Sequence, residues 1–323
     1  MNPNALADLL PTLRAFAIPM RTRFRGITVR EIALMRGPAG WGEFSPFAEY
    51  GPAMSSRWLA SAIESAMTGW PAPVRTAIGV NVTVPAVVPQ AAHEIVAGAG
   101  CRTAKVKVAE PGQSPADDLD RVAAVRAALG SRGKIRVDAN GAWDVETAAG
   151  MLARLAAYDL EYAEQPCATL EELADLRKRT DVPLAADESI RKASDPLAVR
   201  AAGAADIVVL KVAPLGGVRP ALAVAEACGL PVVVSSAVES SVGLAAGVAL
   251  AAALPELHYD CGLATMSLLT GDVTADPLVA ATSGPGRGTL PVRSVTIDEE
   301  KLAQWECDPR AWRARALAAA EFL

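Results

Sequence analysis

The sequence predicts an α/β protein in which a closed parallel barrel follows a small N-terminal α+β unit. Short runs rich in β-branched residues alternate with Ala-, Leu- and Arg-rich segments of helical period through the middle of the chain. This alternation is typical of parallel strands with helices outside them. Eight such runs are present, which favours a closed barrel. An open, doubly wound sheet is the alternative.

The α+β unit is expected over residues 1–78, where residues 24–49 predict a hairpin or meander and residues 53–69 predict a helix. The barrel is expected over residues 79–270. Residues 271–323 are rich in Gly, Pro and Thr at first, and then predict a strand and a closing helix. We expect this last segment to return to the N-terminal unit and cover it.

The expected strands are rich in β-branched residues and are bounded by turn residues. Three of the helices between them begin at residues that commonly cap helix N-termini, namely Ser114, Asp144 and Thr169. The expected strands are residues 79–84, 104–108, 134–138, 161–163, 183–187, 206–212, 231–236 and 257–260 in the barrel, and residues 293–297 in the tail.

Composition and charge favour a metabolic enzyme. With 323 residues, 51% of them hydrophobic and 21% charged, the chain can bury one large core with a smaller domain attached. A net charge of −5 and a pI near 5.3 offer no basic face to a phosphate backbone, so we expect no nucleic-acid partner. The apolar stretch 242–254 is too short to span a membrane, and the N-terminus lacks a signal peptide. We therefore expect a cytoplasmic protein without membrane contact.

Cysteine and histidine chemistry is not expected to carry the function. The five cysteines are scattered, odd in number and without a C-x-x-C pair, which favours reduced thiols over disulfides or a zinc site. His93 and His258 are the only histidines, and neither has a partner at ligand spacing. A Ser–His or Cys–His catalytic triad is therefore not expected.

Three acidic residues each end a short apolar run: Asp138, Glu164 and Asp187. They lie 26 and 23 residues apart, the spacing of successive strand–helix units, so a barrel would bring the three carboxylates to one rim. Two carboxylates about 4 Å apart repel by roughly 4 kcal/mol at an effective dielectric near 20, so the cluster needs a cation. Oxygen-only donors favour a hard ion, first Mg²⁺, which Mn²⁺ could replace.

Lysines lie on the strands to either side of these acids. Lys105 and Lys107 are two residues apart on one strand, so they project about 6.6 Å apart into the barrel near its rim. Their mutual repulsion and a nearby cation should lower the pKa of each toward the range in which a lysine acts as a base. Lys211 ends the sixth strand across the barrel. Salt bridges on exposed strand edges are the alternative, but six such residues at one end of the strands favour a functional site.

Together these motifs resemble the enolase superfamily, and within it the muconate-lactonizing subgroup. K-x-K, D-x-N, E-Q-P, D-E-S and a further strand-borne lysine follow a small N-terminal unit with a G-W-G-E-x-x-P segment. The resemblance covers nearly the whole chain and implies a modified (β/α)7β barrel of the TIM type with a small α+β capping domain. It also implies that Asp138, Glu164 and Asp187 bind Mg²⁺, that Lys107 and Lys211 form an acid/base pair, and that Lys105 contacts the substrate.

Further details narrow the activity that the resemblance implies. The segment PVVVSSAVE lacks the histidine of mandelate-racemase-like members, and Asp260-Cys261-Gly262 lacks the D-x-D of dipeptide epimerases. Segment 235–254 and the D-E-S context are similar to the o-succinylbenzoate-forming branch. The implied reaction is a Mg²⁺-dependent lyase (hydro-lyase) step of menaquinone biosynthesis, from 2-succinyl-6-hydroxy-2,4-cyclohexadiene-1-carboxylate to o-succinylbenzoate. Racemisation of N-succinylamino acids or dipeptide epimerisation is the alternative.

In the implied mechanism Lys107 removes the α-proton, the resulting enediolate is stabilised by the metal, and Lys107 then protonates the departing β-hydroxyl. Lys211 supplies positive charge from the other side. Residues 20–25 and 47–52 are expected to reach over the barrel mouth and exclude water.

Four polar residues are further candidates. Asn140, two residues after the first acid, faces the same way and could support the metal or a ligand, or could be a turn residue. Glu188 directly follows the third acid and is expected behind the metal ligands. Ser235 and Ser236 end the seventh strand and could hydrogen-bond the succinyl end of the substrate, or could simply terminate the strand.

Two other classes of function have less support. A phosphate-binding barrel would show Gly-rich turns after the seventh and eighth strands, whereas Gly216-Gly217 follows the sixth. A non-catalytic barrel would lack at least one acid or lysine of the motif, and none is missing. We therefore expect a small-molecule carboxylate as the ligand.

Overall fold

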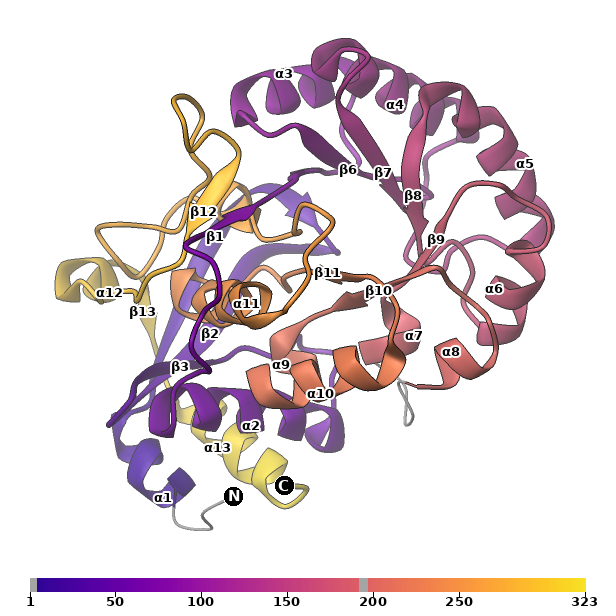
Figure 1. Cartoon of the computed structure of the whole chain (residues 1–323). Helices are drawn as coiled ribbons and strands as arrows, with labels where there is room; N and C mark the ends of the chain where they lie inside the picture. Colours follow the sequence, from indigo (N-terminus) through magenta and orange to yellow (C-terminus); the bar gives the residue numbers. More distant parts are fainter. Residues whose placement is uncertain (1–4, 192–196) are drawn as a thin grey trace.

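A seven-stranded parallel sheet curls into the barrel of this chain (Figure 1). The computed structural model describes residues 5–191 and 197–323. The strand order β11-β10-β9-β8-β7-β6-β5 follows the sequence, and helices pack around the outside of the sheet, as right-handed β-α-β connections require. The strands are β5 (Val82–Val84), β6 (Thr103–Lys107), β7 (Lys134–Asp138), β8 (Leu160–Glu164), β9 (Leu184–Ala186), β10 (Ile207–Leu210) and β11 (Val232–Val234).

Cys261 and Gly262 close the ring in place of an eighth strand. Cys261 forms a parallel bridge with Val80, before β5, and Gly262 forms one with Ser235, after β11. The strand expected at 257–260 is therefore wrong. Its Tyr259 packs edge-on against Tyr162 of β8 at 6.2 Å, so the apolar residues there serve packing rather than strand pairing.

The capping domain is built on a four-stranded antiparallel sheet of order β13-β1-β2-β3. The expected meander at 24–49 misses β1 (Arg14–Phe24), which pairs with β2 (Ile27–Gly37). Pro19 lies inside β1, and a proline within a run argues against a strand. The pairing register shifts between Pro19 and Phe24, so the irregularity lies next to the proline. The other two strands are β3 (Gly40–Phe44) and β13 (Glu306–Cys307).

The C-terminal helix packs against the capping domain. The helix α13 (Arg310–Ala320) lies beside α2 (Pro52–Met67) (Figure 1), and Trp312 of α13 packs edge-on against Phe44 at 5.7 Å. The strand expected at 293–297 is wrong. Instead, Thr289–Pro291 forms β12, which pairs with β4 (Ala77–Gly79).

Helix α11 (Ser241–Ala253) joins the two domains. It is apolar all round, with nearly every residue buried, which is typical of a helix enclosed by protein. It contacts β3 of the capping domain as well as α10 and β11 of the barrel. Among the described residues no helix is both long enough and apolar enough to cross a membrane.

The expected helix caps are confirmed. Ser114 and Thr169 each form a capping box, with Asp117 and Glu172 respectively, and the Asp144 side chain accepts the amide of Thr147. The remaining helices are α1 (Ala5–Leu9), α3 (Pro89–Ala99), α4 (Pro115–Leu129), α5 (Val145–Leu155), α6 (Leu170–Leu176), α7 (Glu188–Arg191), α8 (Ala198–Ala201), α9 (Val212–Leu215), α10 (Val218–Cys228) and α12 (Glu299–Trp305), with short 3-10 helices at Leu10–Thr12, Ala156–Tyr158 and Thr265–Leu268.

Candidate active site

The carboxyl ends of neighbouring barrel strands bring the predicted acids and lysines together. Parallel pairing aligns Lys107 with Asp138 and Asp138 with Glu164, so the three side chains lie at the same level of the barrel. Lys105, two residues earlier on β6, and the residues directly after β9 and β10, Asp187 and Lys211, complete the group. All six side chains of this rim cluster are buried, with at most 8% of each residue exposed: Lys105, Lys107, Asp138, Glu164, Asp187 and Lys211.

Ammonium groups and carboxylates alternate within the rim cluster. Lys105 Nζ lies 2.8 Å from Glu164 Oε1 and 3.1 Å from Asp138 Oδ2. Lys107 Nζ lies 2.6 Å from the same Asp138 oxygen, and Lys211 pairs with Asp187. The ion pairs of the alternative reading are therefore present, but they are buried rather than exposed. Three positive and three negative formal charges cancel within the cluster.

Burial and neighbouring charges shift the pKa values of Lys105, Asp138 and Glu164 in this cluster. Burial by itself would lower the pKa of Lys105, but Glu164 and Asp138 outweigh it and raise that pKa. In this arrangement the pKa of Lys105 therefore rises rather than falls. Burial would raise the pKa of Asp138, but Lys107 and Lys105 bring it below its usual range. Glu164 differs, because burial, followed by Asp138 and Asp187 against the opposing Lys105, raises its pKa to about 7.

The carboxylates of Asp138, Glu164 and Asp187 are suitable ligands for a hard divalent cation, although in the structure they pair with lysines. Among the described residues no group of three or more His, Cys, Asp or Glu side chains is arranged to hold a metal ion. The Lys105 ammonium instead contacts both Asp138 and Glu164. The donors are carboxylate oxygens alone, as Mg²⁺ prefers. Because neighbouring carboxylates help to raise the pKa of Glu164, a cation at this position would favour its ionised form.

Asn140 and Glu188 lie where the sequence places them, beside the acids. Asn140 has a left-handed backbone, with φ 50°, and its Oδ1 accepts a hydrogen bond from Lys107 Nζ. Its amide N–H donates to Asp138 Oδ1 at 3.1 Å, and its Nδ2 donates to Glu188 Oε1 at 3.2 Å. Asn140 is thus a turn residue whose side chain also contacts Lys107 and Glu188.

A small cavity of about 30 Å³ lies at the centre of the rim. Ser235 and Ser236 both line it, and Ser236 Oγ is 2.6 Å from Thr265 Oγ1. The other lining residues include Thr83, Lys105, Lys107, Asp138, Asn140, Lys211, Ala237, Val238 and Gly262.

The first expected lid segment reaches this cavity. Phe24 and Arg25 line it, and the Phe24 ring centre lies 5.5 Å from Lys107 Nζ. The second segment, 47–52, contributes no lining residue. It touches the first one instead, because the Arg25 guanidinium lies 4.4 Å from the centre of the Phe47 ring.

Gln165 belongs to the E-Q-P motif, and its role becomes visible only in the structure. It is fully buried, and its Oε1 accepts the amides of Asp187 and Ser189 at 3.0 and 3.2 Å. Its Nε2 donates to Cys167 O and Ser189 Oγ. Gln165 therefore ties the end of β8 to the end of β9 and fixes Asp187. Its place directly after a strand-end acid is the signal that could have identified it.

Arg121 of α4 supports the lysine strand in a similar way. Its Nη1 donates to the carbonyl oxygen of Lys107 at 2.9 Å and to Asp118 Oδ1 at 2.8 Å. Asp118 in turn accepts the amide of Ala109 at 2.8 Å. Oppositely charged residues three apart on a helix usually stabilise an exposed face. Here the pair is buried, and the sequence pattern does not predict this burial.

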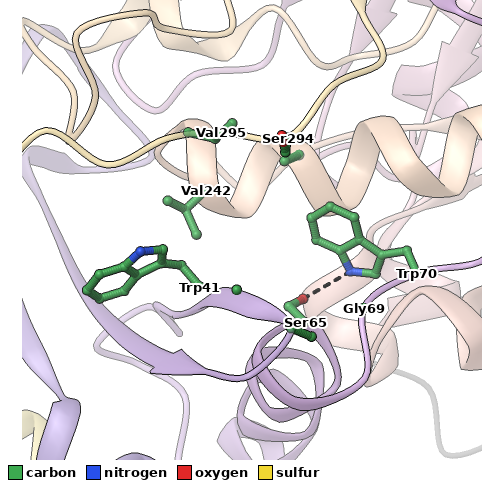
Figure 2. Close-up of a pocket in the computed structure, with 10 residues that line it drawn as sticks. Trp41, Ser65, Gly69, Trp70, Val242, Ser294 and Val295 are labelled. Carbon is green, nitrogen blue, oxygen red and sulfur yellow. Dashed lines mark hydrogen bonds between the residues drawn. The ribbon is translucent and has the colours of Figure 1, made fainter.

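Another cavity, of about 90 Å³, lies between the capping domain and α11 (Figure 2). Trp41, Trp70 and Val242 line it, and Trp70 Nε1 donates to Ser65 Oγ at 3.2 Å. Its lining contains no acid, lysine, arginine or histidine. It is a packing gap between elements and has no groups for acid–base chemistry.

Comparison with known proteins agrees with this geometry. Residues 15–66 match the enolase N-terminal domain-like family, and residues 87–294 match the enolase C-terminal domain-like family. The chain is 67% identical to the o-succinylbenzoate synthase of Thermobifida fusca (strain YX) over 308 residues, 95% of this chain and 96% of the relative. It is 56% identical to that of Mycolicibacterium smegmatis (strain ATCC 700084 / mc(2)155) over 301 residues, 93% and 91% of the two chains.

Solved structures show the same fold at lower identity. The muconate lactonizing enzyme from Pseudomonas fluorescens, complexed with muconolactone, has a TM-score of 0.77 at 23% identity and covers 92% of this chain and 98% of its own. The N-succinyl Arg/Lys racemase from Bacillus cereus ATCC 14579 has a TM-score of 0.75 at 21% identity, covering 92% and 97%. The predicted TIM-type barrel with a capping domain is confirmed.

Proposed function

The chain belongs to the enolase superfamily and, within it, to the o-succinylbenzoate synthases, and we propose that its rim cluster dehydrates 2-succinyl-6-hydroxy-2,4-cyclohexadiene-1-carboxylate to o-succinylbenzoate. The predicted synthase activity is confirmed by relatives at 54–67% identity over most of the chain, and it places the enzyme in menaquinone biosynthesis. One observation carries the assignment of residues: Lys105, Lys107, Asp138 and Lys211 line a single buried cavity at the barrel rim.

Charge balance supports a divalent cation in this reaction. The rim cluster is formally neutral, with three lysines against three acids. The substrate carries two carboxylates, so binding it alone would bury two uncompensated negative charges, at a cost of several kcal/mol per ion. A divalent cation bound with the substrate restores neutrality.

Asp138, Glu164 and Asp187 would hold Mg²⁺, which when bound supplies positive charge next to the substrate carboxylate where negative charge develops. Lys105 and Lys211, which now pair with these acids, would then turn to the substrate. Lys105 would contact a substrate carboxylate. Lys211 would supply a fixed positive charge to the face opposite Lys107.

Lys107 would move the proton. As a neutral amine it removes the proton α to the carboxylate, and the electron pair of that C–H bond passes onto the carboxylate as an enediolate. Lys107, now an ammonium, returns the proton to the departing β-hydroxyl. The C–O bond breaks, water leaves, and the ring becomes aromatic. Asn140 Oδ1, which accepts from Lys107 Nζ, orients the amine throughout, and Ser235 and Ser236 lie where they could hydrogen-bond the succinyl end.

Lysine variants test this assignment of roles. Lys107→Ala should lower kcat at least about 10²-fold, because a positioned general base contributes that much or more. It should also abolish exchange of the α-proton with D₂O. Lys211→Ala should lower dehydration for a different reason, loss of charge, and should leave slow α-proton exchange by Lys107. Normal turnover in the Lys107→Ala protein would overturn the assignment.

The geometry also allows a second activity, N-succinylamino acid racemisation. Lys107 and Lys211 face one cavity from well-separated strands, and a racemase needs a base on each face of the α-carbon. Fast incorporation of deuterium into both enantiomers of an N-succinylamino acid, with negligible dehydration, would make racemisation the main activity. We expect slow exchange at most.

A further inference from the structure

The loop after β11 shapes one wall of the active-site cavity in a strained conformation. Ala237 and Val238 of this loop line the cavity. Val238 has φ 62°, a left-handed conformation that a β-branched residue adopts only at an energetic cost. Such strain persists only where surrounding groups hold it. The groups that hold this loop therefore decide the shape of the cavity wall.

Arg30, on β2 of the capping domain, is one of these groups. It is 2% exposed, and its Nε donates to the carbonyl oxygen of Val238 at 3.0 Å. Its Nη2 reaches Ala237 O at 3.4 Å and also donates to Ser45 O. The buried guanidinium of Arg30 thus links the strained loop to Ser45, which directly follows β3 of the capping domain.

Glu43, in the G-W-G-E segment, holds the other end of the loop. Its Oε2 accepts the amides of Ser240 and Gly243, each at 3.1 Å, and the Ser240 hydroxyl. These amides belong to the N-terminus of α11, where N–H groups lack partners within the helix and favour negative charge. Oε1 accepts the Ser45 hydroxyl at 2.7 Å.

Two glycines, one on α11 and one on β3, leave room for the contact between Glu43 and α11. A Cβ on Gly243 would lie 2.9 Å from Glu43 Oε2. A Cβ on Gly42 would lie 2.0 Å from Ala62 O of α2, so only glycine lets β3 pack closely enough on α2 to aim Glu43 at α11. Gly42 and Glu43 of the G-W-G-E segment therefore both serve the contact between the capping domain and α11.

We propose that Glu43 and Arg30 are positioning residues through which the capping domain fixes the 237–240 loop, and hence the shape of the substrate cavity. This inference rests on the proposed function of the cavity and goes beyond it in assigning a role to two residues that touch no reacting group. It also separates two roles of the capping domain: covering the mouth with residues 20–25, and holding the cavity wall from behind.

Two substitutions of Glu43 are expected to differ in their effect on KM. Glu43→Gln keeps an amide oxygen for Ser240 and Gly243, and its NH₂ can donate to the Ser45 hydroxyl, so KM should stay within about threefold. Glu43→Leu keeps the volume but removes every acceptor. It should raise KM about tenfold while kcat changes less than about threefold, because binding geometry rather than proton transfer is lost.

Glu64 provides a matched control. It lies on α2 of the same domain and caps the N-terminus of a barrel helix in the same way, accepting the amides of Val218 and Arg219 of α10. Neither of those residues lines the active-site cavity. Glu64→Leu should therefore lower thermal stability yet leave KM within about twofold. An equal rise of KM in Glu64→Leu and Glu43→Leu would mean that domain docking in general, and not the loop, is responsible.

Amide hydrogen exchange tests the loop itself and does not depend on turnover. The Glu43→Leu protein should fold, because Asp272 Oδ1 accepts the Ser241 amide and caps α11 independently. Its peptide covering residues 236–244 should exchange at least about tenfold faster than in the unmodified protein, while Glu43→Gln and Glu64→Leu should not change it. If Glu43→Leu fails to fold, Ser240→Ala, which removes one donor, should show a smaller change of the same sign.

The outcomes separate this inference from the proposed function. Unchanged exchange of 236–244 in Glu43→Leu, or unchanged KM with the cyclohexadiene hydroxy acid, would overturn the positioning role. An unmodified protein that does not dehydrate that acid would overturn the proposed function, and the exchange experiment would still decide whether Glu43 holds the loop.

Discussion

Single residues of the rim cluster work through their partners rather than alone. Lys105 shows this most clearly, since its ammonium contacts Asp138 and Glu164 together and occupies the position between two expected metal ligands. Its positive charge offsets the two negative charges beside it. Its raised pKa has the same cause.

Lys105→Met tests whether the lysine and a metal ion are interchangeable here. Removing one partner of a buried ion pair costs about 3–5 kcal/mol, so the variant should be much less stable than the unmodified protein in EDTA. Saturating Mg²⁺ should restore more stability to the variant than to the unmodified protein, because the ion takes over the charge of the lysine. Thermal unfolding with and without Mg²⁺ measures both quantities. Equal Mg²⁺ stabilisation of the two proteins would show that the ion does not take over the charge of the lysine.

Gln165→Leu tests the hydrogen bonds that fix Asp187. The substitution leaves the buried amide of Asp187 without its acceptor, at a cost of about 1–3 kcal/mol, and removes the acceptor of the half-buried Ser189 amide as well. Urea unfolding should show this loss, and Mg²⁺ should bind more weakly because a proposed ligand is no longer held. No change in either quantity would mean that Asp187 is fixed by other contacts.

At the scale of elements, sequence reasoning succeeded where pattern and local chemistry agree. Alternating apolar runs placed β5 to β11, and Ser114, Asp144 and Thr169 marked helix starts that the structure confirms. Strand-end acids and lysines could be found because parallel strands share one functional end. The bridge at Cys261 and Gly262 could not be found, since two residues carry no periodic signal.

Deletions in the two expected lid segments, residues 20–25 and 47–52, test how each contributes to substrate binding. Shortening 20–25 should raise KM or lower kcat without changing Mg²⁺ binding, because Phe24 and Arg25 line the cavity. Shortening 47–52 should have a smaller effect of the same kind, transmitted by the stacking of Arg25 on Phe47. Steady-state kinetics and Mg²⁺ titration of the two deletions measure this order. Unchanged kinetics in the first deletion would place the lid elsewhere.

At the scale of the whole molecule, the two domains meet through buried charges rather than through apolar packing alone. Arg30 and Glu43 reach from the capping domain to the barrel, and Glu64 does so at a second point. Sequence patterns predicted both domains but not these contacts, because a glutamate in a strand looks the same whether it faces water or a helix end. The domain boundaries at residues 78 and 270 stay predictions.

Glu43 gives this interface a dependence on pH. Burial, followed by repulsion from Glu239, raises its pKa to about 7 against the opposing Ser240 and Arg30. A carboxyl group whose pKa is higher in the folded state contributes stability that is fully present below its unfolded pKa, near 4.5, and lost as pH rises through 7. Between about pH 5.5 and about pH 8 the unmodified protein should lose about 2 kcal/mol relative to Glu43→Gln.

Urea unfolding of the two proteins in EDTA at both pH values measures that difference. The comparison cancels the contributions of titrating groups that do not interact with Glu43. A difference of zero, or one of opposite sign, would show that Glu43 is ionised in the folded protein over the whole range.

The central claim is that the rim carboxylates hold the divalent ion on which dehydration depends. The most direct measurement is the rate of o-succinylbenzoate formation by EDTA-treated protein as Mg²⁺ is added back, for the unmodified chain and for Asp138→Ala, Glu164→Ala and Asp187→Ala. We predict no turnover in EDTA, full recovery with Mg²⁺ in the unmodified chain, and no recovery in any of the three folded variants. Full turnover in EDTA, or Mg²⁺-restored turnover in all three variants, would contradict it.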